Sequence, residues 1–217
     1  VDRGLHAGDM KYLDLDGNNK IEQTVSANDI KDQRIIGNSL PRYTYSIRLN
    51  AEWNGIDFSV FFQGVGKQDW YPSSDAFAFW GPYSSPAPSF IPKDFLADVW
   101  SVDNPDAYFP RPRGYIAWTD GRSLSSVNNR YLQSLAYSRL KNLTVGYTLP
   151  VKWLSKIHVQ KARLYFSGEN LLTLDRLDTD YIDPEAAAAG TNWKTGKTNA
   201  LSYPFSKTYS FGIDITF

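Results

Sequence analysis

Cysteine is absent from the 217 residues, so the chain has neither a disulfide framework nor a thiolate metal site. It also lacks the HExxH and CxxC spacings that mark zinc and redox motifs. Lysine and arginine number 23, as do aspartate and glutamate, which leaves no net charge. Because nucleic-acid-binding domains carry a basic surplus, we expect no nucleic-acid partner.

Long hydrophobic runs are missing as well. A membrane-spanning helix needs about 20 apolar residues, and no segment approaches that length. The opening stretch, VDRGLHAGDM, has no apolar core of a signal peptide. We therefore expect the chain to be the C-terminal piece of a longer protein whose targeting segment lies upstream.

Aromatic residues are abundant, at 15%, and they fall into alternating patterns that are typical of strands. The clearest pattern is RYTYSIRLNAEW at 42–53, where apolar and polar side chains alternate without a break. Asn54-Gly55 follows at once and is the strongest short signal for a hairpin, because both positions of a type I′ turn need positive φ. The sequence therefore predicts a hairpin over 42–65.

Three further strands are predicted, at 140–150, 162–174 and 207–217. The connections between the strands are very unequal. Residues 54–55 and 150–161 make short turns, whereas 1–41, 66–136 and 175–206 form long loops around a second hairpin over 137–174. Short turns at one end of a sheet and long loops at the other are typical of outer-membrane barrels. A soluble all-β sandwich, whose strands are usually shorter, is the alternative interpretation.

The chain resembles the C-terminal part of the SusC/RagA family of TonB-linked outer-membrane proteins of Bacteroidetes, which import glycans or peptides. The motifs that carry the resemblance lie in order along the chain: GDMKYLDLDGNNKIE, RIIGNSLPRYTYSIRLNAEWNGIDFSVFFQGV, RYLQSLAYSRLKNLTVGYTLP, ARLYFSGENLLTL, YIDPE and YPFSKTYSFGIDITF. The resemblance implies an all-β fold with about five antiparallel strands of a 22-stranded transmembrane barrel. Leu49 and Ile213 would then face lipid, and Arg48 and Asp214 the lumen.

The resemblance also implies the partners. These are the lipid bilayer, the rest of the barrel and its plug, a SusD-like surface lipoprotein, TonB through an N-terminal region absent here, and a glycan or peptide substrate. A final strand that ends in phenylalanine is the signal that the barrel-assembly machinery recognises. The stripe expected to carry this signal comprises Tyr209, Phe211, Ile213, Ile215 and Phe217; the alternative is that Phe217 merely fills a core.

The stretch DLDGNNKIE resembles a calcium loop of the EF-hand type. Asn19 stands where glycine is usual, and Val25 stands at the twelfth position in place of an acid. Asp29 can close the loop only if the residues between bulge outward. A solvated acidic turn is the alternative. The expected Ca²⁺ ligands are Asp14, Asp16, Asn18, the Lys20 carbonyl, Glu22 and Asp29.

The long loop at 66–136 is rich in flat aromatic rings, which stack on sugars or anchor a protein partner. Packing within the loop itself is the alternative. The candidates for substrate or partner contact are Trp70, Tyr71, Trp80, Trp100 and Trp118.

No catalytic residue and no enzyme activity are predicted. His6 and His158 are isolated in the sequence. The acidic pairs Asp178/Asp180 and Asp183/Glu185 imitate a glycosidase dyad, but loop carboxylates are usually solvated. A soluble carbohydrate-binding module with a calcium loop is the second functional interpretation, and a glycan hydrolase is the weakest.

Overall fold

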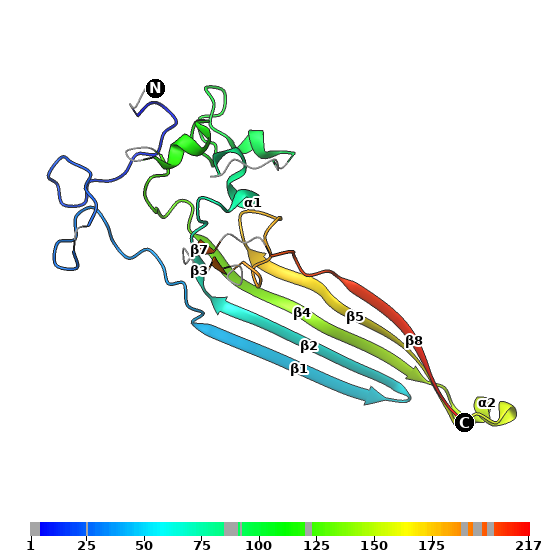
Figure 1. Cartoon of the computed structure of the whole chain (residues 1–217). Coiled ribbons are helices and arrows are strands. Elements are labelled where there is room, and N and C mark those ends of the chain that lie inside the picture. Colours follow the sequence, from blue (N-terminus) through cyan, green and yellow to red (C-terminus); the bar gives the residue numbers. More distant parts are fainter. Residues whose placement is uncertain are drawn as a thin grey trace.

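A computed structural model describes residues 5–24, 26–84, 91, 93–119, 123–187, 191–192, 197–198 and 202–217. Its main feature is one six-stranded antiparallel sheet in which the long strands follow the order β1-β2-β4-β5-β8, with the short β3 beside β4 (Figure 1). The fold is therefore all-β with long antiparallel strands, as predicted. The strands are β1 (Tyr43–Trp53), β2 (Ile56–Lys67), β3 (Asp69–Trp70), β4 (Gln133–Thr148), β5 (Lys161–Arg176), β6 (Thr191–Asn192), β7 (Lys197–Thr198) and β8 (Thr208–Thr216).

The β1–β2 hairpin turns at Asn54 and Gly55, whose φ angles are 49° and 86°. Both angles are positive, as a type I′ turn requires, and this turn sets the pairing of Trp53 with Ile56. The pairing then continues in register along the hairpin to Thr44 and Val65. The local sequence thus fixes which residues of β1 and β2 share a face.

Beyond the hairpin, β4 and β5 are longer than the alternating segments from which the sequence predicted them. β4 begins at Gln133, well before Leu140, and β5 runs on to Arg176. Bulges interrupt the register of β4 at Leu140/Asn142, opposite Phe61/Phe62 of β2. An extra residue in a strand moves the side chains beyond it to the opposite face. The apolar residues in the upstream half of β4 therefore do not continue the alternation of its downstream half.

Helical elements are short. They are α1 (Phe77–Trp80), η1 (Gly81–Tyr83), η2 (Phe95–Asp98), η3 (Gly114–Trp118), α2 (Val151–Leu154) and η4 (Ser155–Ile157). Within the described residues, none of the helices has both the length and the apolar character needed to cross a bilayer.

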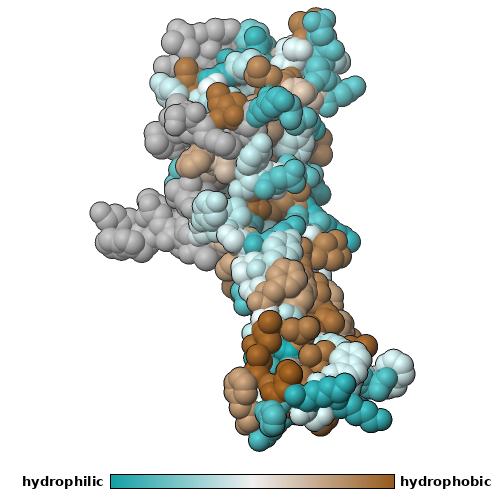
Figure 2. Space-filling model, turned by 90° about the vertical axis from the view of Figure 1, so that its right-hand side faces the viewer, coloured by the Kyte–Doolittle hydropathy of each residue, from teal (hydrophilic) through white to brown (hydrophobic). Residues whose placement is uncertain are grey.

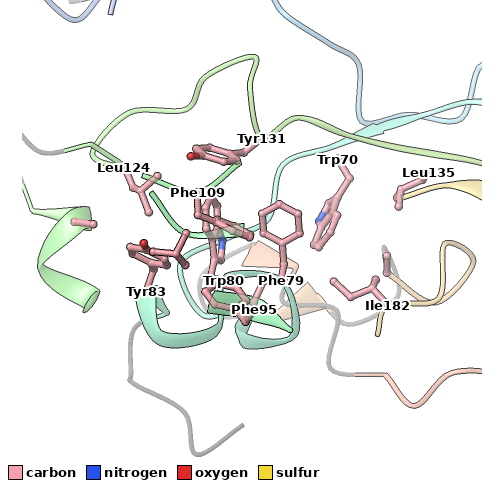
Figure 3. Close-up of a cluster of buried hydrophobic side chains, with 14 residues drawn as sticks. Trp70, Phe79, Trp80, Tyr83, Phe95, Phe109, Leu124, Tyr131, Leu135 and Ile182 are labelled. Carbon is pink, nitrogen blue, oxygen red and sulfur yellow. The ribbon is translucent and has the colours of Figure 1, made fainter. Parts of the chain in front are cut away.

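The main buried core lies at the end of the sheet where the long connections gather (Figure 1). We call this part, residues 71–131 with the segments that pack on it, the loop region. Figure 3 shows that its rings come from separate segments and converge on Trp80, which is fully buried. Leu135 of β4 and Ile182, which follows β5, join the same cluster and attach it to the sheet. α2 and the C-terminal end of the chain lie at the opposite end of the sheet (Figure 1).

Candidate functional site

The sheet has two chemically different faces. Cross-strand pairs such as Leu49 with Val60 and Leu164 with Ile213 place apolar residues together on one face. Most of these side chains are exposed although they are hydrophobic, and Figure 2 shows apolar residues gathered over the lower, strand-built part of the molecule. The apolar face comprises Ile47, Leu49, Ala51, Trp53, Ile56, Phe58, Val60, Phe62, Leu140, Leu143, Val145, Tyr147, Leu164, Phe166, Leu172, Leu174, Tyr209, Phe211, Ile213 and Ile215.

The opposite, polar face carries ion pairs that run across the strands. Arg163 of β5 donates to both carboxylate oxygens of Asp57 on β2, with distances of 2.8 and 2.6 Å, and also to Asp214 on β8 at 3.1 Å. Arg163 reaches Asp57 over Gly146 of the intervening strand β4. A Cβ atom at Gly146 would lie only 2.3 Å from Asp57 Oδ1. The missing side chain is therefore what allows the ion pair to span a strand.

A second charged cluster joins β4 to the segment after β5. Arg139 is 2% exposed and donates to Asp183 Oδ2 at 2.6 Å and to Glu185 Oε2 at 2.7 Å. Lys141 holds the same Glu185 carboxylate at 2.7 Å, and Phe205 lies against both cations. The expectation that Asp183 and Glu185 are solvated loop carboxylates is therefore wrong. Both serve as partners of buried cations, because an arginine in this position needs acceptors.

In the other acidic pair, Asp178 takes part in contacts with the loop region and β4. Asp178 accepts a hydrogen bond from the Tyr108 hydroxyl at 2.9 Å, and its backbone N–H donates to Gln133 Oε1. These bonds attach the segment after β5 to the loop region. No general acid and base follow from such contacts, since the Asp178 carboxylate is held by structural donors.

The acidic loop folds around its own carboxylates. Asp14 accepts hydrogen bonds from the N–H groups of Gly17 and Asn19, both at 2.7 Å. Asp16 in turn accepts from the N–H of Asn18 at 3.1 Å. Asn19 has a φ of 63°, so asparagine takes the left-handed conformation for which glycine is usual.

Asp32, rather than Asp29, lies beside Asp14 and Asp16 in the folded loop. Ligand atoms of Asp14, Asp16 and Asp32 lie within 4.8 Å of one another. Asp29 instead forms an ion pair with Lys31 at 3.2 Å. The 14–32 spacing lies outside any twelve-residue template, so only the folded loop reveals Asp32.

Asp32 is held as an anion by the backbone. The N–H groups of Glu22 and Leu15 donate to its two oxygens at 2.7 and 2.6 Å, and these hydrogen bonds lower the pKa of the Asp32 carboxyl. Of the other expected ligands, Glu22 Oε2 accepts from the Asn18 amide at 2.9 Å, and Lys20 donates its N–H to Asn18 Oδ1. Three carboxylates and amide or carbonyl oxygens are the donor set that a hard cation such as Ca²⁺ takes.

Asp9, which the sequence analysis did not single out, anchors this N-terminal segment to the loop region. Its carboxylate accepts from Arg113 Nη2 at 2.6 Å and Nε at 3.0 Å, and from Ser123 Oγ at 2.7 Å. Burial alone would raise the pKa of Asp9, but these bonds and one from the His6 N–H outweigh it and lower the pKa. These contacts join residues more than a hundred positions apart, so no local sequence pattern predicts them.

The five aromatic candidates have different surroundings. Trp70 and Trp80 are buried in the core of the loop region, where Trp80 makes edge contacts with Trp118 and Tyr131 at ring distances of 4.8 and 5.0 Å. Tyr71 and Trp118 are partly buried against the same core. Burial raises the pKa of Tyr131 to about 12. Self-packing of the loop, the alternative interpretation, therefore describes these four candidates.

Trp100, the fifth candidate, is partly buried. Its ring lies on Gly8, where a Cβ atom would come within 2.3 Å of the indole. With Tyr108 and Arg130 it lines a cavity of about 380 Å³ between the N-terminal segment and the loop region.

No model of a known protein family matches the sequence. Among curated proteins, the TonB-dependent receptor P3 of Formosa agariphila is 32% identical over 212 residues, which cover 95% of this chain and 19% of the relative. The TonB-dependent receptor P26 of the same organism is 27% identical over 213 residues and is matched over 20% of its length. The chain therefore spans about a fifth of the length of these relatives.

Solved structures of the RagAB peptide transporter share the fold. One aligns over 92% of this chain with a TM-score of 0.59 and 22% identity, and the "open-open" state of the RagAB peptide importer aligns over 95% with a TM-score of 0.60 and 23% identity. In both cases the match covers 20% of the other chain. The sequence relatives, with which the shared fold agrees, place this chain in the family of TonB-dependent receptors, as the resemblance to SusC/RagA proteins predicts.

Proposed function

We propose that this chain forms part of the barrel wall of an outer-membrane transporter, and that the complete protein imports oligosaccharides or peptides in a TonB-dependent manner. The two-faced sheet is the observation that carries the proposal. Strands of 11–16 residues, such as β1 and β4, are long enough to cross a bilayer at a tilt. Lipid would cover the apolar face, and the ion-paired polar face would line the lumen.

A soluble carbohydrate-binding module fits this surface poorly. Contiguous exposed apolar patches of this kind are rare on soluble monomers, because each buried CH₂ group gains about 0.8 kcal/mol on leaving water. The edge strands β1 and β8 also have only one neighbour each in the described part of the chain. The remaining strands of a closed barrel would satisfy both edges.

The loop region would lie outside the cell, where a SusD-like lipoprotein could cover it. The RagAB structures are named for peptides, and the SusC/RagA resemblance includes glycans, so both substrate classes belong to the proposal. Exposed rings such as Tyr115 and Tyr203 are better placed for contact than the buried Trp80. No reaction is assigned, since the Asp183 and Glu185 carboxylates form ion pairs with the side chains of Arg139 and Lys141.

The stripe of β8 suits recognition by the assembly machinery. Tyr209, Phe211, Ile213, Ile215 and Phe217 are all exposed and alternate along the strand. In a finished barrel the same stripe would face lipid. Both roles require apolar residues that the chain itself does not bury.

The acidic loop would hold Ca²⁺ through Asp14, Asp16 and Asp32, with Asn18 and the Lys20 carbonyl as further donors. The ion would neutralise three carboxylates and stiffen the segment that leads into β1. It has no catalytic role in this proposal.

Uptake by whole cells tests the transport function. A strain that lacks the full-length gene is compared with the restored strain for uptake of labelled oligosaccharides and labelled peptides. We expect loss of uptake in one of the two classes, restored with the gene and abolished when TonB is removed. Unchanged uptake of both classes would contradict the proposal.

A further inference from the structure

The connection between β4 and β5 is a folded unit at the end of the sheet opposite to the loop region (Figure 1). It consists of residues 149–161 and contains α2 and η4; we call it the α2 unit. Backbone hydrogen bonds join both ends of the unit to the sheet: Leu149 N–H donates to the Ala162 carbonyl at 2.9 Å, and Gln160 N–H donates to the Thr216 carbonyl at 2.9 Å. His158 has a φ of 58° and ends η4 in the left-handed conformation. The unit is thus larger than a plain reversal of the chain requires.

The α2 unit lies on the side of the apolar face. Leu154 and Val159 are buried and pack with Ala162 and Leu149 in a small core of their own. Ala162 pairs with Ile215, a residue of the apolar face. Leu149 follows Tyr147 of that face by two residues, so its side chain points the same way. Because the unit begins at Leu149 and packs on Ala162, it projects from the rim of the apolar face.

Three large apolar side chains of the unit remain outside its core. Val151 is 67% exposed, Trp153 64% and Ile157 65%. The unit places Leu154 and Val159 inside, so it has a defined interior, yet it presents a tryptophan and two branched residues to the surroundings. Trp53 and Tyr147 extend the same kind of surface along the adjacent strand ends. The apolar face thus continues into the α2 unit.

Positive charge accompanies this surface without any acidic residue. The segment LPVKWLSKIHVQK at 149–161 contains no aspartate or glutamate. Lys152 and Lys156 are exposed, and neither of them forms an ion pair with another described residue. Tryptophan and lysine at the edge of an apolar surface are the combination that lies at a membrane interface, with the ring among the headgroups and the ammonium groups at the phosphates.

We propose that the α2 unit is a binding site for anionic phospholipid headgroups in the periplasmic leaflet. This inference rests on the proposed function, since it needs the apolar face to be in a bilayer and the short turns to face the periplasm. Lys152 and Lys156 would contact phosphate groups, and Val151, Trp153 and Ile157 would sit at the boundary of the acyl chains. The unit would then fix the depth of this part of the barrel in the membrane.

Lipid quenching of single labels separates the two proposals. The full-length protein, without other cysteines, carries one fluorophore on Trp153→Cys or on Leu49→Cys and is reconstituted in vesicles with brominated lipids. We expect both labels to be quenched. An unquenched label at position 49 would overturn the proposed function and this inference with it. Quenching at 49 but not at 153 would overturn only the lipid site and leave the α2 unit to a protein partner.

Headgroup preference tests the lysines. Vesicles contain equal amounts of phosphatidylglycerol and phosphatidylcholine, and the bromine is placed on one lipid or the other. The label at position 153 should report phosphatidylglycerol with about thirtyfold preference, the ratio expected for two lysines near an anionic surface. The double variant Lys152→Glu/Lys156→Glu should lower the ratio below one, because two glutamates repel the anionic headgroup. Lys11→Glu/Lys93→Glu, in the N-terminal segment and the loop region, makes the same change of charge and should leave the ratio unchanged. Equal preference in the unaltered protein, or equal loss in both double variants, would overturn the site.

Discussion

At the scale of single residues, a glycine decides how far an arginine can reach. Arg163 and Asp57 belong to strands that are not neighbours, and their contact passes over Gly146 of β4. The same polar face places the Tyr165 ring on Gly212, where a Cβ atom would lie 2.2 Å from the ring. Side chains on this face thus bridge several strands because glycines leave room beneath them.

Substitution of Gly146 tests this contact. In Gly146→Ala the new Cβ would lie 2.3 Å from Asp57 Oδ1 and 2.6 Å from Arg163 Nε, so the pair must separate. We expect a loss of about 1–3 kcal/mol in the free energy of unfolding, the usual cost of overpacking. Thermal unfolding of the full-length protein in detergent measures it. Thr144→Ala, on the same face of β4, is the control, and an equal loss there would contradict the bridging role.

Arg139 is the second residue whose partners are distant in sequence. Arg139→Met would leave the Asp183 carboxylate, 6% exposed, without its cation and should cost about 3–5 kcal/mol of stability. Adding Asp183→Asn should recover part of the loss, because the uncompensated charge is removed. Arg48→Met, which removes an exposed arginine at 5.0 Å from the Phe61 ring, should cost about 1 kcal/mol or less. If Asp183→Asn restores nothing, the buried charge is not the cause.

At the scale of elements, the hairpin and the acidic loop show how local signals differ in strength. Asn54-Gly55 predicted the turn that the structure contains, since both φ angles are set by the two residues themselves. The acidic loop was predicted from Asp14, Asp16 and Asn18, but the position of Asp32 beside Asp14 and Asp16 depends on the fold of the loop. The sequence motif therefore could not identify Asp32.

Calcium titration distinguishes the two candidate closing residues. We expect the full-length protein to bind Ca²⁺ at this loop with a dissociation constant of roughly 10⁻⁴–10⁻³ M, the range of extracellular calcium modules. Asp32→Asn should weaken binding at least tenfold, whereas Asp29→Asn should leave it unchanged because Asp29 pairs with Lys31. Calorimetry compares the variants. A larger effect of Asp29→Asn would restore the ligand set predicted from the sequence, and an absence of binding would leave a solvated acidic turn.

At the scale of the whole molecule, the sheet separates an apolar face from a polar one. Leu49→Arg on β1 would place a charge in the lipid and should cost about 2–4 kcal/mol if the site lies near the bilayer midplane. Asn50→Arg, one position along the strand, would point to the polar face and should be tolerated. The yield of folded, heat-modifiable protein in the outer membrane measures both. Equal losses would contradict the assignment of the two faces.

The sequence by itself determined the strand class, the β1–β2 turn and the division of the hairpin residues between the two faces, because alternation and turn chemistry are local properties. Only the tertiary structure decided that Trp80 is buried, that Asp183 and Glu185 serve Arg139, and that Asp32 joins Asp14. It also showed that the α2 unit projects from the apolar face. Each of these depends on contacts between residues far apart in the chain, whose energies come from packing and charge pairing and leave no periodic trace in the sequence.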